Sequence, residues 1–190
     1  GEIMKKFNYA CKKIAVCLYG QYRTGDYLLP YFKKMADAAN CQVDFFCSTK
    51  EQNNYKFSKS AEEQGLNEIS FEDKDVLFDK IKTSDINPKA VNIVSRSIDE
   101  KFTKCTLDRA GLFYSIADSI NLKSKWEADN GFVYDIVILT RFDAFINPVN
   151  IFDYLRRWYN NISLNRFEKE FNYSTTNNWI IASPLWSQPN

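Results

Sequence analysis

Short apolar runs alternate with amphipathic stretches along the chain. The apolar runs are nearly continuous, which is typical of strands that are buried on both faces of a sheet. They predict strands at 14–19, 42–49, 90–94, 134–145 and 179–183. Apolar residues at three-to-four spacing predict helices at 26–39, at 73–83 and from 106 to 126. Strands that alternate with helices predict an α/β fold with a mostly parallel sheet flanked by helices.

Two of the predicted helices have a recognisable apolar face. In the helix at 26–39, the residues that share a face are Tyr27, Tyr31, Met35 and Ala38. In the helix that follows the candidate N-cap Thr106, they are Ala110, Phe113, Ala117 and Ile120. The stretch 50–67 is polar and predicts a loop.

The composition narrows the chemistry that the chain can carry. The 190 residues suit a single domain, and their formal net charge of +1 does not indicate a nucleic-acid-binding or membrane-binding surface. No run approaches the roughly 18 apolar residues of a transmembrane helix. The absence of histidine excludes Ser-His-Asp and Cys-His catalysis and histidine zinc sites. Any chemistry must therefore use carboxylates, lysines, arginines, hydroxyls, or a metal held by oxygen ligands.

The cysteines indicate the compartment. Their number is five, no C-x-x-C motif is present, and Cys17 and Cys47 lie inside apolar runs. This pattern is typical of reduced thiols, and the beginning of the chain lacks the apolar core of a signal peptide. We therefore expect a cytoplasmic protein in which these cysteines form no disulfide.

Polar residues follow the strand at 14–19 and lead into the next helix. Gly20 allows a sharp turn, Arg23 offers a two-pronged donor for phosphate oxygens, and the helix N-terminus favours an anion. Ligands of open α/β sheets bind outside the carboxyl ends of the strands. The loop lacks the lysine of a P-loop after Gly25. Two interpretations stay open: a phosphate site, or a plain strand-to-helix turn with a surface arginine.

Opposite charges end the strongest predicted strand. Arg141 and Asp143 are two residues apart, so both lie on the same face of that strand. They form either a surface ion pair or part of a site for a divalent cation and a diphosphate. Because exposed pairs contribute little to stability, the second interpretation is favoured.

The segments "IAVCLYGQYRTG", "DFFCST" and "YDIVILTRFD" together resemble a family of small GT-A-fold glycosyltransferases that use nucleotide sugars and occur in bacteria, phages and large viruses. The likeness covers about residues 13–146 in order and spacing. It implies one GT-A-like domain over 1–190, in which 13–146 binds the nucleotide sugar and 147–190 belongs to the acceptor side. No catalytic base stands out after 146, and the segment "NNWIIASPLWSQPN" predicts a strand and loop with no closing helix. We therefore expect either a fragment or a reduced member that lacks its acceptor half.

The resemblance also implies roles for individual residues. The nucleotide pocket would be lined by Gly20, Gln21 and Arg23 and flanked by Ser48 and Thr49. Asp143 would stand where the D-x-D motif of the family holds Mn²⁺ or Mg²⁺, and Arg23 and Arg141 would contact the diphosphate. This chain has Arg141-Phe142-Asp143 in place of that motif, so only one carboxylate is left for a metal.

The function implied is transfer of a sugar from a nucleoside diphosphate-sugar donor to a glycan or another acceptor, as in surface glycan biosynthesis. The alternative is a non-catalytic module of the same fold that binds a nucleotide or a protein partner. The lone aspartate favours the module, whereas the loop from Gly20 to Arg23 favours the enzyme.

Overall fold

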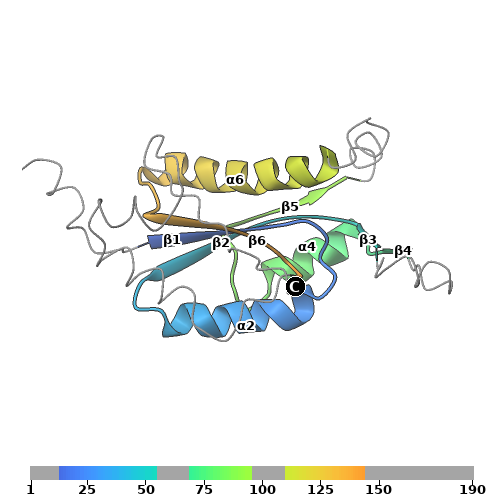
Figure 1. The fold of residues 1–190 in the computed structure, drawn as a ribbon, viewed down its shortest axis with the longest axis horizontal. Coiled ribbons are helices and arrows are strands. Elements are labelled where there is room, and N and C mark those ends of the chain that lie inside the picture. Colours follow the sequence, from blue (N-terminus) through green and yellow to red (C-terminus); the bar gives the residue numbers. More distant parts are fainter. Residues whose placement is uncertain (1–12, 55–68, 96–109, 144–190) are drawn as a thin grey trace, which may run out of the picture.

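A four-stranded parallel sheet forms the centre of the fold (Figure 1). The computed structural model describes residues 13–54, 69–95 and 110–143. In spatial order the strands are β5 (Ala90–Val94), β2 (Gln42–Lys50), β1 (Lys13–Tyr19) and β6 (Ile136–Arg141). All three pairings are parallel, so the predicted α/β class with a parallel sheet is confirmed.

Helices cover both faces of this sheet. The helices α2 (Gly25–Ala38) and α4 (Lys74–Lys82) lie on one face, and α6 (Ala110–Asn130) lies on the other (Figure 1). None of the helices in the described ranges is long and apolar enough to span a membrane. This layered arrangement follows from the parallel strands, since each needs a crossover connection to the next.

Most element boundaries agree with the sequence predictions to within one residue, namely those of β1, α2, β2, α4 and β5. The helix predicted to end at Trp126 continues to Asn130. The predicted loop at 50–67 is wrong at its beginning, because β3 (Gln52–Asn54) pairs there with β4 (Ile69–Phe71) in an antiparallel ladder. The predicted helix start at Thr106 and the predicted strand at 179–183 lie outside the described residues.

The larger hydrophobic core lies between the sheet and the α2–α4 side. Alternate residues of β1, such as Val16 and Leu18, meet the rings of Phe32 and Phe45, whose centroids are 6.4 Å apart. Burial of each such side chain stabilises the fold by about 1.5–3 kcal/mol. These contacts fix α2, and with it the loop that precedes α2, against the sheet.

The buried face of α2 differs from the predicted one. Leu28, Leu29, Phe32 and Met35 are buried, whereas Tyr27 is 83% exposed. Only Met35 belongs to both sets. The apolar spacing allowed two faces. The sheet takes the face with leucine and phenylalanine, while Tyr31 packs at the edge of this core.

The face of the sheet under α6 has a smaller apolar core and several polar groups. Ala15, Cys17, Phe46 and Tyr134 form its buried cluster. The helix itself buries polar side chains there, namely Ser115, Ser119 and Lys123. The apolar residue Phe113 is 65% exposed, so the apolar spacing identified the wrong face of this helix.

The cysteines of the described ranges, Cys17, Cys41 and Cys47, carry free thiols. Cys17 packs in the core under α6 and Cys47 in the core on the other face, so these two side chains point in opposite directions from the sheet. Burial raises the pKa of the Cys17 thiol to about 12. Such thiols are poor nucleophiles, and we assign them a packing role.

Candidate anion-binding site

The carboxyl ends of β1, β2 and β6 meet at one edge of the sheet. Tyr19, the last residue of β1, is paired with Ser48 on one side and with Arg141 on the other. The loop that starts at Gly20 therefore leaves the sheet between the ends of its two neighbours. The three strand ends that carry polar residues therefore lie side by side at this edge.

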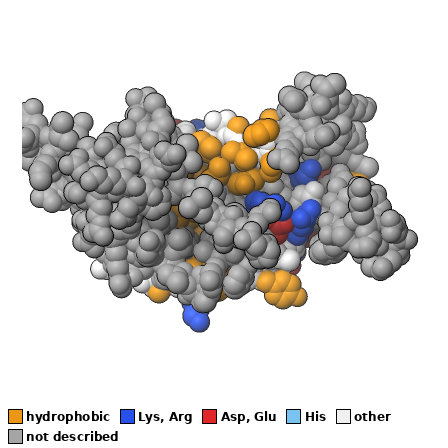
Figure 2. Space-filling model, viewed as in Figure 1, with side chains coloured by type: hydrophobic (Ala, Val, Ile, Leu, Met, Phe, Trp, Pro, Cys, Tyr) orange, Lys and Arg blue, Asp and Glu red, His pale blue; other side chains and the backbone are white. Residues whose placement is uncertain are grey.

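Two arginines from different strand ends contact one carboxylate. The Arg23 Nη1 atom donates to Asp143 Oδ2 at 2.9 Å. Arg141 binds the same carboxylate with two prongs, Nε to Oδ1 and Nη2 to Oδ2, each at 2.7 Å. The Nε atom of Arg23 donates to Gln21 Oε1 at 2.8 Å. Figure 2 shows basic side chains around an acidic one at this end of the sheet, beside a hydrophobic area.

This cluster is ionised and keeps an excess positive charge. Burial acts to raise the pKa of Asp143, but the hydrogen bonds and charges of Arg141 and Arg23 outweigh it and hold that pKa below its usual value. The hydrogen bond to Asp143 raises the pKa of Arg141. Among the described residues, two guanidinium groups contact one carboxylate, which leaves one positive charge in excess within this group of three. The arrangement is therefore suited to bind an anion.

Two buried aromatic rings hold the charged residues in place. Tyr22 is 2% exposed and Phe142 is fully buried, and their ring centroids are 5.5 Å apart. Tyr22 immediately precedes Arg23, and Phe142 lies between Arg141 and Asp143. Because the rings are anchored in the core, the charged neighbours project from it toward each other.

The backbone of the first loop is tightly constrained. At Gly25, a Cβ atom would lie 2.3 Å from the ring of Tyr22, so only glycine fits there. The hydroxyl of Tyr22 donates to Asp26 Oδ1 at 2.9 Å. Arg23 has a φ of +38°, a left-handed conformation that costs about 1–3 kcal/mol and is uncommon for residues other than glycine. The fold thus keeps Arg23 in a strained conformation that points to Asp143.

We expect Gly20→Ala to destabilise the fold by about 1–2 kcal/mol, because Gly20 has a φ of +90° that a Cβ atom disfavours. Among the described residues, no atom lies within 4 Å of the new methyl group, so the expected cost is that of the backbone. Urea unfolding measures it. The matched control is Gly131→Ala after α6, where φ is +69° and the space is also open. Both variants should lose stability, but only Gly20→Ala should weaken binding of pyrophosphate. If Gly20→Ala and Gly131→Ala bind pyrophosphate equally well, the loop at Gly20 is not part of the anion site.

Ser48 and Thr49 are both completely buried and do not join the arginine cluster through any hydrogen bond of the described residues. Ser48 Oγ donates to Asp118 Oδ2 on α6 at 2.6 Å. Asn92 on β5 donates to the same oxygen at 2.8 Å. Among the described residues, the Thr49 hydroxyl is buried without a hydrogen-bond partner. Their expected position at the flank of a nucleotide stays a prediction.

Sequence analysis missed Asp118 and Asn92. Neither lies in a motif, and Asp118 occupies a helix whose face was assigned from apolar residues only. The available signal was the strand pairing itself, since Asn92 is in register with Ser48. A polar pair on neighbouring buried strands requires a partner from the covering helix, and Asp118 is that partner.

The described residues do not fit a divalent-cation site in this arrangement. Both oxygens of Asp143 accept hydrogen bonds from guanidinium groups. Mg²⁺ and Mn²⁺ need several oxygen ligands and carboxylates that are free to bind them. Within residues 13–54, 69–95 and 110–143, no group of three or more acidic or cysteine side chains could hold a metal. The geometry gives no support to Asp143 as a metal ligand.

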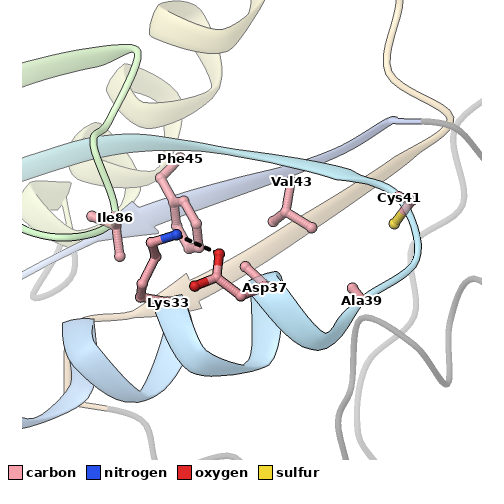
Figure 3. A pocket seen from close by; sticks show the side chains of 8 residues that line it. Lys33, Asp37, Ala39, Cys41, Val43, Phe45 and Ile86 are labelled. Atoms are coloured by element: carbon pink, nitrogen blue, oxygen red, sulfur yellow. Dashed lines mark hydrogen bonds and ion pairs between the residues drawn. The ribbon is translucent and has the colours of Figure 1, made fainter.

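A pocket of about 300 Å³ lies at the other end of β2, between this strand and α2 (Figure 3). Its lining combines the ion pair of Lys33 and Asp37 with apolar residues such as Val43 and Phe45. The two charges neutralise each other, whereas binding sites normally present polar groups that converge on a ligand. We therefore place the candidate site at the strand ends and not in this pocket.

Comparison of the chain with models of protein families, with curated proteins and with solved structures finds no match. The fold is an α/β fold with a parallel sheet, and two arginines and one aspartate form a cluster at the carboxyl edge of that sheet, which is the candidate site. The function rests on the geometry of that site and on the sequence motifs that build it.

Proposed function

We propose that the chain is a GT-A-like glycosyltransferase that binds the diphosphate of a nucleotide sugar with Arg23 and Arg141. One observation carries this proposal, the convergence of the two guanidinium groups from separate strand ends. They lie at the edge where open α/β sheets bind ligands. The resemblance of the sequence over about 13–146 to nucleotide-sugar glycosyltransferases supports the donor class.

The chemistry of such a transfer suits this site. As the bond between the sugar and the diphosphate breaks, negative charge develops on the leaving oxygen. Positioned arginines stabilise that charge, and a diphosphate offers the paired oxygens that guanidinium groups bind best. The acceptor, a glycan or another molecule, would receive the sugar. The cytoplasmic location expected from the reduced cysteines stays a prediction.

A second candidate is a non-catalytic module of the same fold that binds a nucleotide. It is favoured by Asp143, the one carboxylate that contacts both arginines among the residues the structure describes, because this carboxylate is paired with each of them. Donor hydrolysis in the absence of an acceptor separates the two. An enzyme slowly releases sugar from its donor, whereas a module binds the nucleotide and leaves the donor intact.

We expect UDP, GDP or their sugars to raise the melting temperature of the protein, because a ligand that binds only the folded state stabilises it. Arg23→Met and Arg141→Met should each weaken binding about tenfold, the effect of losing one or two charge-assisted hydrogen bonds. Calorimetric titration measures this. Lys125→Met is the control, since it removes an equal charge from a side chain of α6 that is 75% exposed. Failure of all nucleoside diphosphates and their sugars to bind would refute the proposal.

A further inference from the structure

Asp143 occupies the position that an anionic ligand would take between the two arginines. It accepts three hydrogen bonds of 2.7–2.9 Å, and its side chain is only 14% exposed. A phosphate group presents paired oxygens to the same guanidinium geometry as a carboxylate does. A ligand phosphate and this carboxylate therefore require the same donors.

We propose that Asp143 is an internal counterion that a diphosphate displaces, and that the site binds nucleoside diphosphates without a divalent cation. This inference rests on the proposed function and assigns Asp143 a role opposite to that of a metal ligand. The carboxylate keeps the two guanidinium groups together. In the complex, the diphosphate replaces it and takes both positive charges.

The contacts of the two arginines show why displacement is feasible. Arg23 is also held by Gln21 through its Nε atom, so its Nη1 atom stays directed into the site when Asp143 leaves. Arg141 is half exposed, and within the described residues its hydrogen bonds all go to Asp143. This arginine can follow the new anion at little cost, since its own side chain is not fixed by the core.

Charge balance explains why displacement is favoured over joint binding. If the carboxylate stayed in place, it would lie beside the phosphate oxygens. The three described side chains, Arg23, Arg141 and Asp143, would then offer one net positive charge to attract those oxygens. Like charges in contact are strongly unfavourable. Once Asp143 has moved toward solvent, two positive charges face the diphosphate. The carboxylate therefore lowers the affinity of the site for its ligand, whereas a metal ligand would raise it.

Asp143→Asn should therefore bind UDP about tenfold more tightly than the unmodified protein, measured by calorimetry with EDTA present, because the competing charge is removed. The matched control is Asp129→Asn, which removes one negative charge from an exposed residue of α6. It should bind UDP as the unmodified protein does. Asp143→Ala should change affinity in the same direction as Asp143→Asn and covers the case in which the asparagine variant folds poorly.

Each outcome separates this inference from the proposed function. If UDP binds only with Mn²⁺ and Asp143→Asn abolishes binding, Asp143 is a metal ligand and the inference is overturned, while the proposed function stands. If UDP binds in EDTA and Asp143→Asn binds equally or more weakly, the inference is again overturned. If Asp129→Asn increases the affinity for UDP as much as Asp143→Asn does, the increase is an effect of net charge alone. That result would also overturn the inference. If UDP, GDP and their sugars bind neither with nor without Mn²⁺, the proposed function itself fails.

Discussion

Phe142→Ala is expected to lower the free energy of unfolding by about 3–5 kcal/mol, the usual cost of emptying a fully buried aromatic position. The ring is completely buried and packs on Tyr22 at a centroid distance of 5.5 Å. Removal of the ring loses the hydrophobic stabilisation that its burial provides, and it leaves a cavity beneath the arginine cluster. Urea unfolding followed by tryptophan fluorescence measures the loss.

The control for this variant is Phe113→Ala. Phe113 lies on α6 and is 65% exposed, so its replacement should change stability by no more than about 0.5 kcal/mol. A loss at Phe113 comparable to that at Phe142 would mean that the apolar face of α6 is buried after all. If Phe142→Ala lowers the free energy of unfolding only slightly, the packing of Phe142 on Tyr22 is not what holds Arg23 and Asp143 in place.

The sheet and the position of the site were largely predictable. A continuous apolar run such as 14–19 has one reasonable structure, a strand buried on both faces, and its end is marked by Gly20. Once several such strands are parallel, their carboxyl ends must share one edge, which brings Arg23 close to Asp143 without any knowledge of the loops. Pattern and topology suffice for this part because neither depends on a particular partner side chain.

The two-stranded ladder could not be predicted in the same way. β3 consists of Gln52, Asn53 and Asn54, which have no apolar alternation and low strand propensity. Its strand conformation depends on backbone pairing with Ile69–Phe71, far along the chain. A single-sequence pattern does not contain such a pairing, so a loop was the natural but wrong interpretation.

The role of Asp143 shows a similar limit at the site. Its spacing from Arg141 allowed either a surface pair or a metal ligand. The structure adds a third group, Arg23, 120 residues earlier, whose guanidinium group binds the same carboxylate. The role of Asp143 as a metal ligand stays a prediction. Local spacing cannot show how many cations converge on one carboxylate, and this number determines whether the carboxylate is free for a metal.

The face of α6 was assigned wrongly for a physical reason that is specific to this sheet. Apolar spacing assumes that the covered surface is apolar. Here the surface under α6 contains Asp44 and Ser48, both buried, and buried polar groups need hydrogen-bond partners. Tyr134 donates to Asp44 Oδ2 at 2.6 Å, and Asp118 of α6 accepts from Ser48. The helix therefore turns a partly polar face inward.

The buried ion pair of α6 gives the clearest test of this arrangement. Lys123 is 1% exposed, and its Nζ atom lies 2.5 Å from Glu127 Oε2. The other carboxylate oxygen of Glu127 accepts a hydrogen bond from the backbone N–H of Tyr134 at 3.0 Å, which fixes the chain between α6 and β6. Removal of one member of a buried pair leaves the other charge without its partner, which is more costly than removal of both.

Lys123→Met should therefore lower the free energy of unfolding by about 3–5 kcal/mol at neutral pH, although methionine fills nearly the same volume. The double variant Lys123→Met/Glu127→Gln should recover much of this loss, because glutamine carries no charge and still accepts from the Tyr134 N–H group.

Lys125→Met is the matched control on the same helix. Its partner Asp129 is also four residues ahead, at 2.8 Å, but both side chains are exposed, so the cost should be about 0–1 kcal/mol. Urea unfolding of the three variants at one pH compares them directly. Equal losses for Lys123→Met and Lys125→Met would contradict the buried position of Lys123. A double variant no more stable than Lys123→Met would show that packing, and not the unpaired charge of Glu127, accounts for the loss.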